Sequence, residues 1–178
     1  MRILALDIAS ATGVAFGCAD DSAPSLSTLR LPAASEINEY GPRLTAFRRG
    51  LISLICDYRP ERIWFEAPFI ALSNGAIKNA NSSRLLMVLA GIAEQIADEF
   101  EIPSIETTNA EVRKHFLGSA HGKRDELKEA MMRRCRLLGW EPNNDNEADA
   151  AGIWDLARHK HRASRRLSSS MPLVGVSR

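Results

Sequence analysis

Two short apolar runs in this chain each end on an acidic residue, and this pattern constrains the fold more than any other feature. Asp7 follows Ile3-Leu4-Ala5-Leu6, and Glu66 follows Ile63-Trp64-Phe65. Short apolar runs bounded by polar residues are typical of buried strands. A carboxylate at the end of a buried strand is costly unless something compensates its charge. The two runs therefore predict buried strands whose terminal acids share a compensating partner.

The rest of the chain alternates between strand and helix patterns. Strands are expected over residues 2–8, 13–17, 26–31, 62–66 and 102–106. Apolar residues at helical spacing predict helices over about 42–58, 83–100, 109–118, 123–138 and 147–161, and residues 68–82 are expected to form a loop. Asn109 is suited to cap the third helix. This order indicates an α/β fold in which a mixed central sheet, with three antiparallel strands and then parallel strands, is flanked by helices.

Length and composition set the broad class of the protein. A chain of 178 residues with 45% apolar and 25% charged residues fits one domain with a substantial core. We expect that domain over residues 1–163 and a basic, disordered tail over 164–178. Three widely spaced cysteines without a CxxC pair fit a reducing cytoplasm. No apolar stretch approaches the roughly 18 residues of a membrane span, so no membrane partner is expected.

A third acid completes a candidate metal site. Asp149 lies at the start of the last predicted helix. Parallel strands bring their carboxyl ends to one edge of a sheet, so the three acids are expected to converge. Carboxylates are the ligands that Mg²⁺ prefers, and such a cluster indicates metal-dependent phosphodiester cleavage. Asp145 shares a helix face with Asp149, and Glu147 lies in the loose first turn, so both remain candidates for a fourth ligand.

Several polar and basic residues suit contacts with nucleic acid. Phe69 can stack on an unpaired base, although packing under its own loop is an equal alternative. Lys123 opens a helix after a glycine-containing loop and is a candidate for stabilising the charge of the scissile phosphate. The candidate DNA-binding residues are Phe69, Asn74, Lys78, Asn79, Asn81, Arg84, Arg113, Lys114, Lys123 and Arg124.

These motifs together resemble the RuvC family of Holliday-junction resolvases, within the RNase H-like superfamily, and particularly its phage and prophage branch. The resemblance covers about residues 1–160. It rests on Ile3-Leu4-Ala5-Leu6-Asp7-Ile8-Ala9 with Gly13, on Phe65-Glu66-Ala67-Pro68, and on Glu147-Ala148-Asp149-Ala150. It implies an RNase H-like fold and a homodimeric nuclease that nicks branched DNA with two Mg²⁺ ions, for which Mn²⁺ can substitute.

The same resemblance implies roles for individual residues. Asp7, Glu66 and Asp149 match the family's acidic ligands, whereas Asn146 stands where the family often has another Asp. Asp145 or Glu147 is then the replacement. Three alternative functions stay open: an ATP-handling enzyme of the actin and sugar-kinase type, a non-catalytic module that binds branched DNA, and an RNase H-like nuclease for flaps or RNA–DNA hybrids. The chain length of 178 residues disfavours the first.

Overall fold

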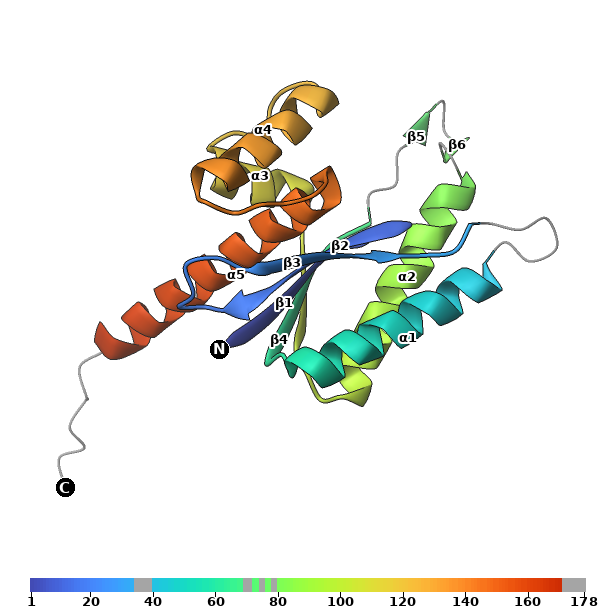
Figure 1. Ribbon diagram of the computed structural model, residues 1–178, viewed down its shortest axis with the longest axis horizontal. Helices are drawn as coiled ribbons and strands as arrows, with labels where there is room; N and C mark the ends of the chain where they lie inside the picture. Colours follow the sequence, from blue (N-terminus) through green and yellow to red (C-terminus); the bar gives the residue numbers. More distant parts are fainter. Residues whose placement is uncertain (34–39, 69–71, 74–75, 78–79, 171–178) are drawn as a thin grey trace.

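A mixed five-stranded sheet lies at the centre of the structure, a computed structural model that describes residues 1–33, 40–68, 72–73, 76–77 and 80–170 (Figure 1). Its strands are β1 (Arg2–Asp7), β2 (Ala11–Cys18), β3 (Ser25–Arg30), β4 (Arg62–Glu66) and β7 (Ser104–Thr107), in the order β3-β2-β1-β4-β7. β2 pairs antiparallel with both β1 and β3, and β1, β4 and β7 are parallel. This arrangement confirms the predicted sheet. A separate pair, β5 (Leu72–Ser73) and β6 (Ala76–Ile77), lies where only a loop was expected.

Helices cover both faces of this sheet (Figure 1). One layer contains α1 (Gly41–Tyr58) and α2 (Ala80–Glu99), and the other contains α3 (Asn109–Leu117), α4 (Arg124–Leu137) and α5 (Asp145–Ser170). Every predicted helix is present. The last helix is longer than expected and continues to Ser170, so part of the segment predicted as a disordered tail is helical. Residues 171–178 lie outside the described part of the chain.

The core has two layers because side chains along a strand alternate between the faces of a sheet. On β1, Ile3 and Ala5 pack into the layer that contains Trp154 of α5. Leu4 and Leu6 point to the other face, toward α1 and α2. Both faces of the central strands are therefore buried, which explains why these strands read as continuous apolar runs in the sequence.

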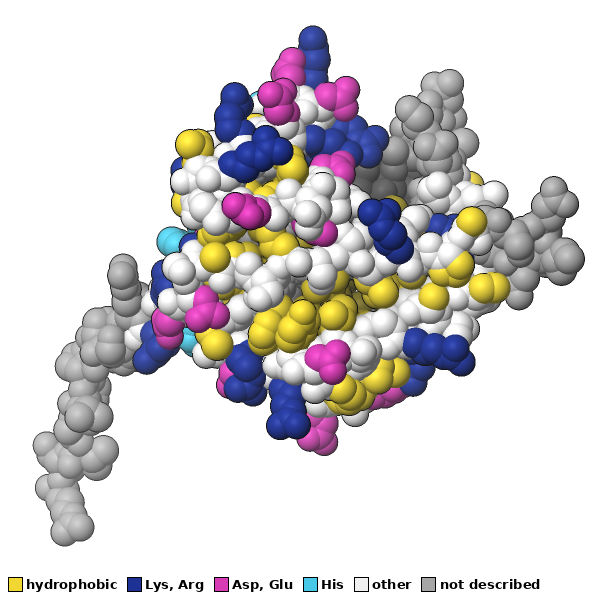
Figure 2. All heavy atoms as spheres, in the orientation of Figure 1, with side chains coloured by type: hydrophobic (Ala, Val, Ile, Leu, Met, Phe, Trp, Pro, Cys, Tyr) yellow, Lys and Arg dark blue, Asp and Glu magenta, His cyan; other side chains and the backbone are white. Residues whose placement is uncertain are grey.

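The surface over α3 and α4 carries many charged side chains. Figure 2 shows Lys and Arg side chains interspersed with Asp and Glu over these two helices, while apolar side chains gather along the edge of the sheet between the helical layers. Across the described segments, no helix combines the length and the apolar character needed to cross a membrane.

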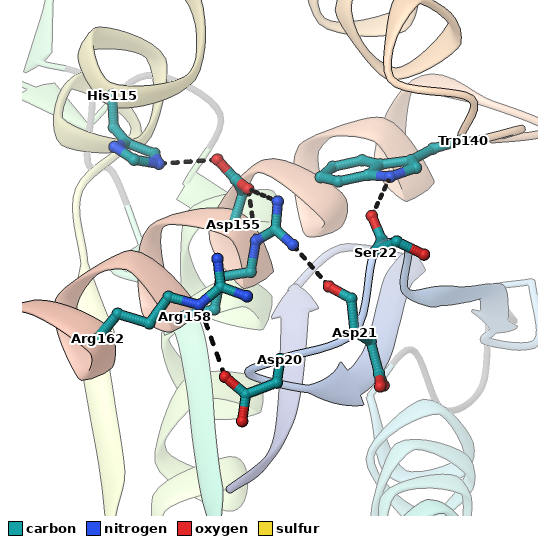
Figure 3. Close-up of polar contacts among 8 residues, drawn as sticks. All are labelled: Asp20, Asp21, Ser22, His115, Trp140, Asp155, Arg158 and Arg162. Atoms are coloured by element: carbon teal, nitrogen blue, oxygen red, sulfur yellow. Dashed lines mark hydrogen bonds and ion pairs between the residues drawn. The ribbon is translucent and has the colours of Figure 1, made fainter. Parts of the chain in front are cut away.

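Polar contacts hold α5 in place against its neighbours (Figure 3). Arg158 donates from Nε to Asp155 Oδ1 at 2.7 Å and from Nη1 to the backbone carbonyl of Asp21 at 2.8 Å. Asp155 also contacts His115 of α3, with 2.8 Å between Oδ2 and Nε2. Since Asp155 lies on the same helix as Asp149, this network sets the position of the helix that carries the third candidate acid.

Candidate active site

The three predicted acids meet at one end of the sheet. Asp7 is the last residue of β1 and Glu66 is the last residue of β4, and these neighbouring strands run parallel. Asp149 comes from the second turn of α5. All three acids line one cavity of about 250 Å³, here called the acid cavity. The fold thus brings together three carboxylates that are far apart in the chain, as the sequence pattern predicts.

A glycine on β2 allows α5 to approach the sheet this closely. A Cβ atom on Gly13 would lie 1.9 Å from the backbone oxygen of Asn146 and 2.3 Å from its carbonyl carbon. Both are main-chain atoms that cannot rotate away. The absence of a side chain at Gly13 therefore lets the first turns of α5 reach the sheet, where Asp149 meets the strand acids.

Burial and mutual repulsion make the acid cluster unfavourable when its members are charged. Burial raises the pKa of Asp7 well above its ordinary value, and the charges of Asp149, Glu66 and Asp145 raise it further. Burial also raises the pKa of Asp149 to about 6, although the Arg113 guanidinium acts in the opposite direction. Carboxylates that raise one another's pKa are the groups that a bound cation would stabilise.

The donor set of the acid cavity fits hydrated divalent cations. Mg²⁺ usually keeps several waters and takes one or two protein carboxylates together with substrate phosphates. Asp7, Glu66 and Asp149 supply such carboxylates, and Asn146 also lines the cavity. Within the described residues, no three Asp, Glu, His or Cys side chains form a group that could hold one ion. The arrangement fits ions held by one or two acids each better than a closed protein cage.

Basic side chains line the same cavity. Arg113 of α3 is joined there by Arg124 and Lys128 of α4, which are four residues apart and so share a helix face. Lys128 also forms an ion pair with Asp145 at the start of α5. Lys128 was not predicted as a site residue from the sequence. Its spacing of four residues from Arg124, a predicted DNA-binding residue, could have indicated that the two side chains share a helix face.

Lys123, the predicted catalytic cation, lies elsewhere. It precedes the first turn of α4, its side chain is 87% exposed, and its Nζ lies 3.9 Å from Glu126. It is outside the described lining of the acid cavity. The contacts therefore favour Lys128 over Lys123 as the cation near the acids.

The two candidates for a fourth acid differ in their contacts. Glu147 is 3% exposed, and its carboxylate accepts hydrogen bonds from the Thr28 hydroxyl at 2.6 Å and from the Asn143 backbone N–H at 2.8 Å. It ties β3 to the loop before α5. Neither Glu147 nor Asp145 is among the described residues that line the acid cavity. Asp145 lies near enough to raise the pKa of Asp7. These contacts favour Asp145 as the additional acid and a structural role for Glu147.

Asn109 positions a carboxylate and does not cap its helix. The cap of α3 is Thr108, which has extended backbone and whose hydroxyl accepts a hydrogen bond from the Glu111 backbone N–H at 3.2 Å. The amide of Asn109 instead donates to both carboxylate oxygens of Glu66, at 2.9 and 3.1 Å. The expectation of a cap at Asn109 is wrong by one residue, and the side chain is free to orient Glu66.

The predicted DNA-binding residues fall in different places. Arg113 and Arg124 line the acid cavity, and Lys114 is exposed on α3. Asn81 and Arg84 are exposed near the start of α2. Their roles in DNA binding stay predictions. The candidates that lie outside the described residues are Phe69, Asn74, Lys78 and Asn79.

Comparisons with other sequences point to one group of enzymes. A crossover junction endodeoxyribonuclease RuvC of Dehalococcoides mccartyi is 28% identical over 174 residues, which cover 95% of this chain and 98% of the relative. The RuvC of Prochlorococcus marinus is 31% identical over 118 residues, which cover 65% of this chain and 70% of the relative. No protein-family model matches the chain. Placement in the phage and prophage branch stays a prediction.

Solved structures share the fold. Thermus thermophilus RuvC in complex with a Holliday junction substrate has a TM-score of 0.68 at 16% identity, covering 92% of this chain and 97% of that chain. The yeast mitochondrial Holliday junction resolvase Ydc2 has a TM-score of 0.58 at 12% identity, covering 94% and 84%. The predicted RNase H-like fold is therefore confirmed. With this fold and with 31% identity over 70% of a RuvC sequence, the chain belongs to the RuvC family of crossover junction endodeoxyribonucleases.

Proposed function

We propose that this chain is a divalent-metal-dependent endonuclease that resolves Holliday junctions. One observation carries the proposal: Asp7, Glu66 and Asp149 line one cavity at the carboxyl end of the sheet in a RuvC-family chain. A cluster of buried acids has no evident structural use, because each carboxylate is costly to bury beside the others. Its position at the end of parallel strands is typical of ligand sites in α/β folds.

The residues of the acid cavity would have separate roles in phosphodiester hydrolysis. Asp7, Glu66 and Asp149, with Asp145 as the additional acid, would hold two Mg²⁺ ions, or Mn²⁺ as a substitute. When bound, such ions stabilise charge on the attacking and leaving oxygens of an in-line displacement. Asn109 keeps the Glu66 carboxylate in one orientation through its two hydrogen bonds.

The basic residues of the acid cavity would bind the substrate phosphate. Arg113, Arg124 and Lys128 lie around the same space as the acids, so a phosphodiester entering it meets positive charge on its non-bridging oxygens. Preorganised positive charge at a developing anion stabilises the transition state more than the ground state. The chain therefore supplies both the metal ligands and the groups that hold the phosphate.

A panel of synthetic substrates tests this function. Purified protein is incubated with four-way junctions, flapped or Y-shaped DNA, linear duplexes and RNA–DNA hybrids, with and without Mg²⁺ or Mn²⁺. Paired symmetric nicks on the four-way junction, only with metal, are expected. Equal cutting of all substrates would contradict the preference for junctions, and tight junction binding without nicking would instead indicate a non-catalytic module.

Replacing Lys128 tests the assignment of the cation. We expect Lys128→Ala to lower the nicking rate by about 10²-fold, the scale of losing one preorganised charge at the reacting phosphate. Lys123→Ala, at the residue just before this helix, is the matched control and is expected to change the rate less than about threefold, because its side chain faces solvent. The rates of both variants are measured by single-turnover nicking of a four-way junction. A larger loss with Lys123→Ala would restore the assignment made from the sequence.

We also propose that the protein acts as a homodimer through α2. Leu85 and Leu89 of this helix are buried in the core, whereas Met87 is 50% exposed and Val88 is 39% exposed. The helix thus has an apolar surface left uncovered by the described parts of its own chain. A second copy would cover it, and a two-fold dimer matches the symmetry of a four-way junction.

Replacing Met87 with aspartate is expected to convert the dimer to a monomer. A charge placed in an apolar interface loses hydration without gaining a partner, so association weakens while each subunit stays folded. Leu137→Asp is the matched control, because Leu137 is also apolar and 75% exposed but lies on α4. Light scattering after gel filtration measures the mass of each variant. A monomeric wild-type protein, or an equal effect of Leu137→Asp, would contradict the proposed interface.

We also propose that the protein is cytoplasmic and forms a single nuclease domain. The three cysteines are free, and Cys135 is buried, which raises the pKa of its thiol to about 12 and makes it unreactive. Helices of both layers pack on one sheet. The proposed domain of residues 1–163 continues as helix to Ser170.

A further inference from the structure

A groove with a partly apolar lining lies between α3 and α4, two helices that pack against each other and against α5 (Figure 1). Its volume is about 440 Å³, within the range of about 300–1,000 Å³ that is common for ligand pockets. We call it the α3–α4 groove. The residues that line it are His115, Phe116, Leu117, Gly118, Ala130, Arg133, Arg134 and Leu137. None of them is among the described residues that line the acid cavity.

The helix α4 presents a second face to this groove. Its buried face is made by residues at every fourth position, Leu127, Met131 and Cys135. Ala130, Arg134 and Leu137 are spaced by four and three positions, so their side chains share another face. Leu137 is 75% exposed, the largest exposed fraction of any large apolar side chain in the described segments. An apolar residue therefore stays in solvent at the groove, on a face of α4 that the core does not use.

Unpaired positive charge lies beside this apolar surface. Arg133 and Arg134 line the groove, and neither forms an ion pair with a described residue. The guanidinium carbon of Arg134 lies 6.0 Å from the centre of the Phe116 ring. His115 also lines the groove, but its Nε2 already contacts Asp155. No Asp or Glu is among the described lining, so the groove offers two arginines to an acidic partner.

Three kinds of occupant can be compared by this chemistry. A phosphate backbone would meet the arginines but would leave charged oxygens against apolar side chains. A second copy of the chain, joined by two-fold symmetry at this groove, would place the same arginines opposite each other, and like charges across an interface are unfavourable. A protein segment with an apolar side chain between acidic ones satisfies both parts of the groove. Its acids can pair with Arg133 and Arg134, and its apolar side chain can cover Leu137.

We propose that the α3–α4 groove docks an acidic, amphipathic segment of a partner protein, in which an aliphatic or aromatic side chain is flanked by Asp or Glu. The apolar side chain is the anchor, because a few well-packed contacts carry most of the energy of an interface. The acids give specificity and fast association. Since the groove and the acid cavity share no described lining residue, the segment can bind while a junction occupies the acid cavity. This docking does not depend on nuclease activity.

A displayed library of random linear peptides tests the proposal without identification of the partner. Peptides are selected on the full-length wild-type protein, and the enriched sequences are synthesised with a fluorescent label. Their affinities are measured by fluorescence anisotropy in chelator and without DNA. We expect the enriched sequences to carry an apolar residue flanked by Asp or Glu, and their affinities to fall as the salt concentration rises. A lack of enrichment, or enriched sequences without acids, would overturn the proposal.

Two substitutions remove the two kinds of contact separately. Leu137→Ser and Arg134→Glu are each expected to weaken binding of the enriched peptides by about 10-fold or more, the scale of losing one central interface contact. Leu138→Ser is the matched control for the first, because Leu138 is the next residue and is 38% exposed but is outside the described lining of the groove. Arg49→Glu, at an exposed position of α1, is the matched control for the second. Both controls are expected to change the affinity less than about twofold.

The remaining outcomes exclude the other occupants. Unchanged peptide affinity in Leu137→Ser and Arg134→Glu proteins, shown to be folded by circular dichroism, would overturn the proposal. A saturating four-way junction, added in chelator, should leave the peptide affinity within about twofold of its value without DNA, since distant sites act independently. Displacement of the peptides by the junction would show that they bind the DNA-binding surface, and would overturn the proposal too. Failure of the protein to nick any substrate would contradict the nuclease function but would not change these affinities.

Discussion

Replacing Asp7 with asparagine is expected to lower the nicking rate of a four-way junction by about 10³-fold or more while junction binding survives. Asp7 ends the central strand β1 and lines the cavity with Glu66 and Asp149, so we expect its carboxylate to be a ligand on which metal binding would depend. Asparagine keeps the shape and removes the charge. The loss should reach or exceed the scale of removing one preorganised electrostatic group.

The same substitution should not destabilise the metal-free protein. Because burial and neighbouring acids raise the pKa of Asp7, the charged form is less stable in the folded protein than in the unfolded chain. Above that pKa, removing the charge raises the free energy of unfolding. Thermal unfolding at neutral pH in chelator measures this, and Mg²⁺ should stabilise the wild-type protein more than the variant.

The exposed acid Asp98 of α2 provides the control for Asp7. Asp98→Asn is expected to leave both the nicking rate and the unfolding temperature close to wild type. If Asp7→Asn failed to fold, or unfolded at a clearly lower temperature in chelator, Asp7 would be a structural residue and the metal site would lose its central member. Full nicking activity in a folded Asp7→Asn protein would also contradict the proposed metal site.

Gly13→Ala is expected to destabilise the protein by about 1–3 kcal/mol or more and to abolish most of its nicking. The new Cβ would lie 1.9 Å from the Asn146 backbone oxygen, so β2 and α5 must separate. That movement displaces the helix turn carrying Asp149 from the other two acids. Urea unfolding measures the stability. Nicking under conditions where the variant is still folded measures the effect on the site.

Gly17 is the matched control on the same strand. A Cβ there would meet the Trp154 ring at 3.0 Å, and a side chain can shift by a few tenths of an ångström where main-chain atoms cannot. We therefore expect Gly17→Ala to cost less stability than Gly13→Ala and to retain nicking. Equal losses in the two variants would show that the close approach at Gly13 does not specifically position Asp149.

The strand acids could be placed from sequence because two simple regularities act on them. An apolar run that ends on an acid marks a strand end, and parallel strands share an edge, so Asp7 and Glu66 had to be neighbours once β1 and β4 paired. The position of Asp149 could also be predicted, because the last helix packs on the same sheet. The mixed sheet and its helices could also be predicted, because the periodicity of apolar side chains reflects which faces of each element are buried.

The helix residues could not be placed in the same way, because a helix presents a different face with each residue. Whether Lys123 or Lys128 faces the acids depends on where α4 begins and how it docks, and Lys123 proved to precede the first turn. Glu147 was a candidate ligand until packing brought it against Thr28 of β3, a residue 119 positions away in the chain. Asn109 was assigned to a helix end because its contact with Glu66 is also long-range.

The sequence by itself determined the order of strands and helices, the burial of the sheet on both faces and the three acids at its end, since these follow from local patterns of apolar and polar residues. Only the tertiary structure decided which amides and cations turn toward those acids and how closely α5 approaches Gly13. The physical reason is that direction and contact depend on how elements pack against one another, and packing joins residues whose separation along the chain carries no signal.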